Sequence, residues 1–128
     1  MDFQYEYFNG KEYLAICRKE DIANGKGIKI QFPDDDDMQV AVIKYENEIY
    51  CVGNICPHRH AAEIYNGILK DGNVTCPLHG WTYNLATGTN TNLKQGIRSL
   101  KTYNVIEIDG FIYIEKPELE IPKWRKID

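Results

Sequence analysis

The scarcest chemically active side chains of this protein are gathered in one stretch. The chain holds four cysteines and three histidines among 128 residues, and five of these seven lie between Cys56 and His79. Residues 56–61 read CPHRHA and residues 76–81 read CPLHGW, so each segment offers thiol and imidazole groups a few residues apart. Cysteine and histidine at such short spacing are typical of a metal site. The fold must therefore bring two separated loops to one point.

The cysteines are expected to be free thiols in a cytoplasmic protein rather than parts of a disulfide framework. Residues 1–6, MDFQYE, show no basic segment followed by an apolar one, which argues against secretion. A reducing cytosol keeps thiols unpaired. The longest apolar runs, such as residues 39–43, have the length of a strand, so no membrane-spanning helix and no membrane partner are expected.

Charge and missing motifs exclude several classes of function. The net charge is −4 and residues 34–37 form an acidic run, which argues against a nucleic-acid partner. We interpret this run as a solvated turn, with a docking surface for a basic redox partner as the alternative. The sequence contains no GxGxxG, Walker A or GxSxG motif. Three histidines cannot supply both this cluster and a separate two-histidine, one-carboxylate iron site.

Short apolar runs separated by turn residues dominate the rest of the chain. The hairpin signals Asp71-Gly72 and Asp109-Gly110 stand out, because Asp and Gly tolerate positive φ. Helical turns are expected only at residues 18–23 and 61–65. The sequence predicts an all-β, antiparallel fold. Its strands are expected at residues 13–17, 28–32, 38–45, 49–52, 68–70, 74–75, 103–108 and 111–114.

The chain is expected to form a single domain over residues 1–128. Its length fits one globular unit, and 43% apolar with 27% charged residues is ordinary for such a unit. The core is expected over about residues 13–116, and residues 117–128 form a tail without strand periodicity. We interpret Trp124 in this tail as a cover for a sheet edge.

Two metal centres suit a set of two cysteines and two histidines. Zinc binds such a set tetrahedrally in a closed structural site. A Rieske 2Fe-2S centre instead places two cysteines on one iron and two histidines on the other. Zinc fingers bring cysteine with cysteine and histidine with histidine along the chain. Here each loop supplies both kinds of ligand, which favours a two-iron cluster held between the loops.

The chain resembles the soluble Rieske-type ferredoxins over roughly residues 13–116. The resemblance lies in CPHRHA and CPLHGW, which match the patterns C-x-H and C-x-x-H, and in the closing segments LKTYNV and DGFIYI. It implies that Cys56 and Cys76 bind one iron of a single 2Fe-2S cluster and that His58 and His79 bind the other. It also implies a Rieske iron-sulfur fold of three stacked antiparallel sheets, with the cluster-binding loops at one tip.

Several positions depart from the Rieske proteins of respiratory complexes. Those proteins carry an additional cysteine in each loop, joined in a disulfide, and the matching positions here are Ala61 and Leu78. Trp81 replaces a serine that lies near a cluster sulfur, while Tyr83 keeps the matching tyrosine. Fewer hydrogen-bond donors stabilise the reduced cluster less. We therefore expect a reduction potential near the lower end of the Rieske range, about −150 mV.

One histidine and two cysteines remain outside this ligand set. Cys17 and Cys51 lie in apolar strand runs and are expected to be buried core residues. Many relatives have glycine at the position of His60, which we interpret as an exposed loop-tip residue. Two alternatives stay open for His60. It replaces His58 as a ligand, or it lies beside the exposed iron and makes the potential depend on pH.

The resemblance implies a soluble one-electron carrier rather than an enzyme in its own right. The expected donor is a flavin-dependent reductase, and the expected acceptor is a terminal oxygenase or another oxidoreductase. Oxygenase subunits of the superfamily continue far beyond a Rieske domain to hold a mononuclear iron, whereas this sequence ends soon after it. One alternative is the small subunit of a nitrite reductase, although members of that group commonly lack the ligands present here. The other is a structural zinc domain that acts in protein interactions.

Overall fold

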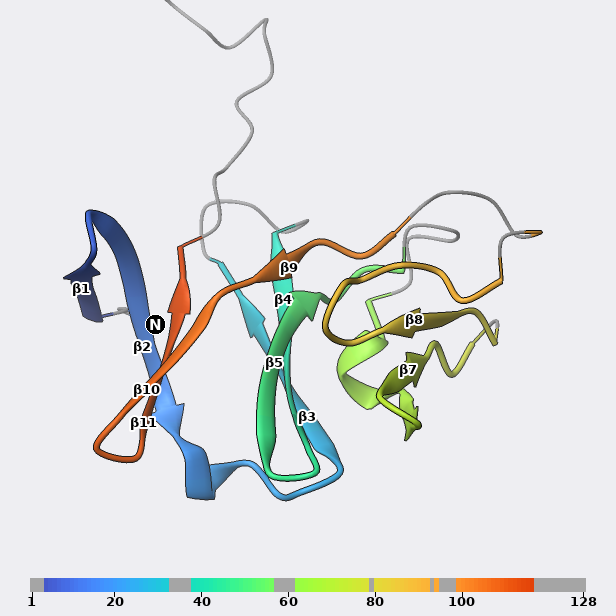
Figure 1. Ribbon diagram of the computed structural model, residues 1–128, viewed down its shortest axis with the longest axis horizontal. Coiled ribbons are helices and arrows are strands. Elements are labelled where there is room, and N and C mark those ends of the chain that lie inside the picture. The colour runs from blue at the N-terminus through green and yellow to red at the C-terminus, as the bar shows by residue number, and fades with distance from the viewer. Residues whose placement is uncertain are drawn as a thin grey trace, which may run out of the picture.

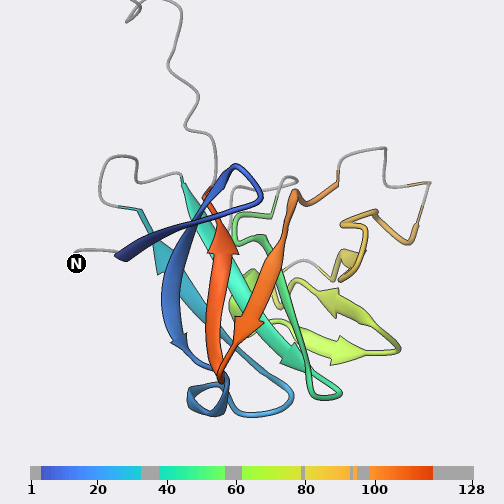
Figure 2. The ribbon, with the colours of Figure 1, turned by 60° about the vertical axis from the view of Figure 1, so that its left-hand side comes forward.

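The computed structural model of the protein describes residues 4–32, 38–56, 62–78, 80–92, 94 and 99–116. Within them, antiparallel strands form three sheets (Figure 1). In Figure 2 the strands of the first sheet cross in front of those of the second, and the third sheet lies to their right. This architecture confirms the predicted all-β, antiparallel fold.

The first sheet joins the beginning and the end of the described chain. Its order is β1-β2-β11-β10, formed by Gln4–Phe8 (β1), Lys11–Arg18 (β2), Val105–Ile108 (β10) and Phe111–Glu115 (β11). Asp109 and Gly110 connect β10 to β11 with φ values of 52° and 82°, which confirms the predicted hairpin. A bulge where β11 pairs with β2 interrupts the alternation of buried and exposed positions next to Cys17. Cys17 is therefore only half-buried, and its expected full burial is wrong.

The second sheet is the middle layer. Its order is β3-β4-β5-β9, formed by Lys26–Gln31 (β3), Gln39–Tyr45 (β4), Glu48–Gly53 (β5) and Thr102–Tyr103 (β9). Val40 and Val42 of β4 pack in one apolar cluster with residues of the first sheet. Ala41 and Ile43 pack in another cluster with residues of the third sheet. Burial on both faces explains why β4 is continuously apolar instead of alternating.

The third sheet has the order β6-β7-β8, formed by Ile68–Lys70 (β6), Asn73–Thr75 (β7) and Thr82–Asn84 (β8). Asp71 and Gly72 connect β6 to β7 with φ values of 54° and 77°, as predicted. Two short 3-10 helices, Lys19–Asp21 (η1) and Ile64–Asn66 (η2), fall where helical turns were expected. In the sequence, helix η2 connects the first predicted ligand segment, residues 56–61, to this sheet.

Two of the described strands, β1 and β8, were not predicted from the sequence. Both are short and become strands through pairing, β1 with β2 and β8 with β7. The acidic run and the tail with Trp124 lie outside the described residues. Over the part of the chain that is described, no helix has the length and apolarity needed to cross a membrane.

Candidate metal centre

Cys56 and Cys76 follow two separate strands, and both belong to one buried apolar cluster of side chains. Cys56 follows β5 and Cys76 follows β7, and each has an exposed fraction of 0%. Both share the cluster with Tyr83, and Trp81 packs against it. All four cysteines of the chain are free of disulfides. The structure thus brings two of the four predicted site residues together.

The histidines lie outside the described residues. This holds for His58 and His79, and also for His60 and Ala61. Their roles as ligands or neighbours of a metal therefore stay predictions. Leu78, which stands where respiratory Rieske proteins have a cysteine, is described and is 58% exposed. The second segment consequently runs from a buried cysteine to a solvent-exposed leucine.

Asn54 lies two residues before Cys56 and forms hydrogen bonds with residues that follow the first segment. Its side chain is fully buried, and Nδ2 donates to Gln39 Oε1 at 3.0 Å and to the carbonyl of Ala62 at 3.2 Å. Its Oδ1 accepts a hydrogen bond from the backbone N–H of Tyr65 at 2.8 Å. Its carbonyl accepts another from the N–H of Ile64 at 3.2 Å. Asn54 thus ties the chain before Cys56 to the chain after Ala61, which fixes where the loop begins and ends.

The β7–β8 hairpin carries the second segment as a tight loop. The N–H of Cys76 donates to the carbonyl of Trp81 at 2.8 Å, and the N–H of Gly80 donates to the carbonyl of Cys76 at 3.0 Å. At the base of the loop, the hydroxyls of Thr75 and Thr82 lie 2.8 Å apart. Gly80 has a φ of 73°, a conformation that glycine adopts without strain. Short-range contacts therefore position Cys76.

Tyr83 forms a hydrogen bond with one of the two predicted cysteine ligands. Its side chain is fully buried and its Oη lies 3.5 Å from Cys56 Sγ. Burial raises the pKa of Tyr83, and the hydrogen bond to Cys56 and the charges of Cys56 and Cys76 raise it further. The phenol is therefore protonated at physiological pH and is able to donate this hydrogen bond to a metal-bound sulfur. This agrees with the sequence-based comparison, in which Tyr83 matched a tyrosine near the cluster.

A turn built on Gly88 holds the chain that follows the hairpin. Gly88 donates from its N–H to the carbonyl of Asn84 at 2.7 Å and accepts a hydrogen bond from the N–H of Leu100 at 2.8 Å. Its φ is 76°, and a Cβ at this position would overlap the carbonyl oxygen of Leu100. Leu100 belongs to the same buried cluster as Cys56. The turn thereby anchors this side of the site.

Sequence reasoning missed Asn54 and Gly88 as parts of the site. Each is a polar or small residue in a connecting segment, where such residues are ordinary. The partners of Asn54 include Gln39, which is distant in the sequence. Only the position of Asn54, directly between a strand and the first metal-binding segment, could have signalled it.

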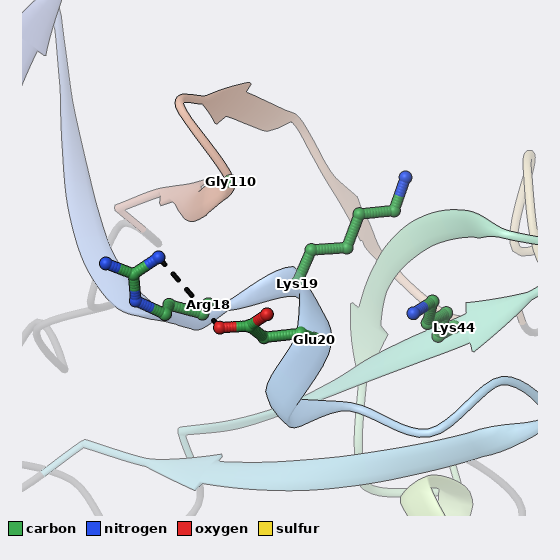
Figure 3. A pocket seen from close by; sticks show the side chains of 5 residues that line it. All are labelled: Arg18, Lys19, Glu20, Lys44 and Gly110. Atoms are coloured by element: carbon green, nitrogen blue, oxygen red, sulfur yellow. Dashed lines mark ion pairs between the residues drawn. The ribbon is translucent and has the colours of Figure 1, made fainter.

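A hollow elsewhere on the surface is unrelated to the cysteines. It has a volume of about 260 Å³ and is lined by Arg18, Lys19, Glu20, Lys44 and Gly110 (Figure 3). Arg18 and Glu20 form an ion pair of 3.9 Å beside it (Figure 3). Lys44 pairs with Ile49 near the start of β5, whereas Cys56 follows its end. Exposed ion pairs of this kind contribute little to stability and do not form a metal site.

The described site fits a cationic metal centre. Two thiolates buried in an apolar cluster would be strongly disfavoured without a compensating cation. Metal ions supply that compensation, and thiolate is a preferred ligand of both iron-sulfur clusters and zinc. The hydrogen bond from Tyr83 to Cys56 Sγ is of the kind that tunes a metal-bound sulfur. The buried side of such a centre would thus be formed by Cys56, Cys76 and Tyr83.

Comparisons with known proteins agree with one another. The family model described as "Rieske [2Fe-2S] domain" matches residues 12–104. The ferredoxin subunit of 3-phenylpropionate/cinnamic acid dioxygenase from Photorhabdus laumondii is 35% identical over 106 residues, covering 82% of this chain and 95% of the relative.

Two solved structures show the same fold. A ferredoxin of Sphingomonas yanoikuyae B1 matches with a TM-score of 0.70 and 25% identity, over 81% of this chain and 98% of the other. A putative NADH-dependent nitrite reductase small subunit from Mycobacterium tuberculosis matches with a TM-score of 0.72 and 21% identity, over 84% and 96% of the two chains. These likenesses confirm the predicted fold.

Proposed function

Because the chain belongs to the Rieske [2Fe-2S] domain family, we propose that Cys56 and Cys76 bind one iron of its cluster and that His58 and His79 bind the other. The burial of both thiols in one apolar cluster of side chains with Tyr83 supports this assignment. The cofactor of the family is a Rieske-type 2Fe-2S cluster, one in each domain, and the chain is a one-electron carrier. It is an electron-transfer component rather than an enzyme that acts alone.

The described residues keep the cysteine side of the centre away from water. Cys56 and Cys76 are fully buried, and Trp81 packs against their cluster. When bound, the cluster gains or loses one electron at a time. Tyr83 donates a hydrogen bond to Cys56 Sγ and so stabilises the negative charge that reduction adds. Leu78, which directly precedes His79 in the sequence, is exposed and offers an apolar contact to a redox partner.

We propose a terminal oxygenase as electron acceptor and a flavin-dependent reductase as donor, with residues 1–128 acting as one domain in the cytoplasm. The name of the Photorhabdus laumondii relative, a dioxygenase ferredoxin subunit, supports an oxygenase partner. The net charge of −4 favours weak, salt-sensitive docking to basic surfaces. The nitrite reductase small subunit shares the fold at 21% identity. Stable co-purification with a large catalytic subunit would favour that second kind of assembly.

Visible absorption and electron paramagnetic resonance of the anaerobically purified, reduced protein test the ligand assignment. We expect a reddish-brown protein with a Rieske-type signal, whereas a zinc protein is colourless. Replacing His58 or His79 by Ala should abolish the signal, and His60→Ala should retain it. A signal of all-cysteine ligation contradicts the assignment. So does a signal that survives His58→Ala and is lost in His60→Ala.

A further inference from the structure

Asn90 carries a buried hydrogen-bond donor without a partner. The residue is only 5% exposed, and its Oδ1 accepts a hydrogen bond from the N–H of Asn92 at 2.9 Å. Its Nδ2 is buried and has no hydrogen-bond partner among the described residues. An amide N–H buried without an acceptor costs free energy, and folded proteins keep few such groups. The free donor therefore requires an explanation.

Backbone pairing determines the direction of this side chain. Asn90 and Tyr83 form an antiparallel bridge, and two hydrogen bonds of 2.9 Å flank the pair without involving either residue. They are thus a non-hydrogen-bonded pair, in which the two side chains lie close together on the same face. The carboxamide of Asn90 therefore lies on the face that carries the phenol of Tyr83.

The face shared by Tyr83 and Asn90 is the one that carries the thiols. Tyr83 Oη lies 3.5 Å from Cys56 Sγ, and Cys76 belongs to the same buried cluster. Because Oδ1 of Asn90 is held by the N–H of Asn92, the amino group is the half of the carboxamide left free on the buried side. An N–H dipole in such a poorly solvated place acts strongly on nearby negative charge.

We propose that Asn90 raises the reduction potential of the cluster, through the buried N–H dipole of its Nδ2 on the face that it shares with Tyr83 and the thiols. The proposal rests on the function and ligand set proposed above. One electron from the reductase adds one negative charge to the centre, and an N–H dipole stabilises the reduced form more than the oxidised form. Asn90 acts alongside Tyr83 in this role. Its N–H dipole contributes to the electrostatic potential at the metal centre, and Asn90 is not a ligand.

The test compares midpoint potentials of cluster-loaded variants. Asn90→Leu removes the donor and keeps the branched shape of the side chain, and Asn90→Ala serves if the leucine variant does not fold. We expect a three- to tenfold shift of the redox equilibrium toward the oxidised form, which is a midpoint about 30 to 60 mV lower. Asn92→Ala is the matched control, because Asn92 is exposed in the same loop. It should leave the midpoint unchanged.

A thermal unfolding measurement separates this role from a structural one. Asn90→Leu removes the unpartnered Nδ2 donor and also the Oδ1 acceptor of the Asn92 N–H, but Asn92 is exposed and its N–H can bond to water instead, so the melting temperature should change little. A lowered potential together with retained stability supports the proposal. An Asn90→Leu midpoint equal to that of Asn92→Ala overturns it.

A double variant tests whether Asn90 acts only by holding Tyr83. In the Tyr83→Phe background, Asn90→Leu should lower the midpoint by a similar further amount. If the second shift vanishes, Asn90 works through the tyrosine hydroxyl and the proposal fails. Lack of a Rieske-type signal in the unaltered protein would instead contradict the proposed function. The two failures are therefore distinguishable.

Discussion

Among single residues, Tyr83 has the most direct contact with the predicted metal ligands. It is fully buried, its Oη is 3.5 Å from Cys56 Sγ, and its raised pKa keeps the phenol protonated. An unperturbed tyrosine ionises near pH 10, so a residue with a raised pKa remains a donor at all pH values below that.

Tyr83→Phe should lower the midpoint potential. The lost hydrogen bond is worth about 0.5–1.5 kcal/mol, which for one electron corresponds to about 20–60 mV. A redox titration that is monitored by visible circular dichroism measures the shift. Tyr103→Phe is the matched control. Burial raises the pKa of Tyr103 to about 12 as well, but the neighbours that raise it further are Cys51 and Glu115 and not Cys56 or Cys76. Equal midpoints for the two variants would rule out a role for the Tyr83 hydroxyl.

Asn54→Ala should make the protein lose its 2Fe-2S cluster more readily. The substitution leaves the N–H of Tyr65 and the carbonyl of Ala62 without their partners, a loss of about 2–4 kcal/mol. The rate at which visible absorption is lost on heating or chelation should rise. Asn66→Ala, an exposed asparagine in the adjoining helix η2, should behave like the unaltered protein. Unchanged cluster loss in Asn54→Ala would contradict its anchoring role.

At the scale of elements, the hairpins were the most predictable features. Asp71-Gly72 and Asp109-Gly110 adopt positive φ at both positions, as their residue types favour. The information lies within a few residues, so no distant contact can alter it. Strand β8 was missed because its three residues show no clear pattern and become a strand only beside β7.

The turn at Gly88 should be far less tolerant of a side chain than the turn at Gly72. Both glycines have similar φ, 76° and 77°, but a Cβ at Gly72 meets nothing within 4 Å, whereas at Gly88 it overlaps the carbonyl of Leu100. Gly72→Ala should cost about 1–2 kcal/mol of unfolding free energy from the left-handed conformation alone. Gly88→Ala should cost clearly more and lower the melting temperature further. Equal melting temperatures would show that the close approach to Leu100 is relieved without cost.

At the scale of the whole molecule, two apolar clusters lie on opposite faces of the middle sheet. One contains Cys56, Cys76 and Tyr83, and is shared with the third sheet. The other contains Leu14, Ile112 and residues of β4, and is shared with the first sheet. Only the first of these apolar clusters contains the predicted cysteine ligands.

Removal of the cluster should loosen one half of the protein. Two buried thiols then lose their metal, so the third sheet loses its main anchor, while the first and second sheets keep their own core. Amide hydrogen exchange in β6, β7 and β8 should accelerate more than about tenfold, with β2 and β11 changing little. Mass spectrometry of loaded and metal-free protein measures both regions. A uniform acceleration over all strands would show that the two clusters unfold as one unit.

The sequence by itself determined the two cysteine- and histidine-containing segments, the hairpins and the antiparallel all-β class, because each depends on residue types at short spacing. It also determined the family through those segments. Only the tertiary structure decided that Asn54 anchors the first loop, that Asn90 lies beside Tyr83, and that β4 is buried on both faces. Those features arise from contacts between residues far apart in the chain, and a polar residue in a connecting segment carries no local sign of the partner it will meet.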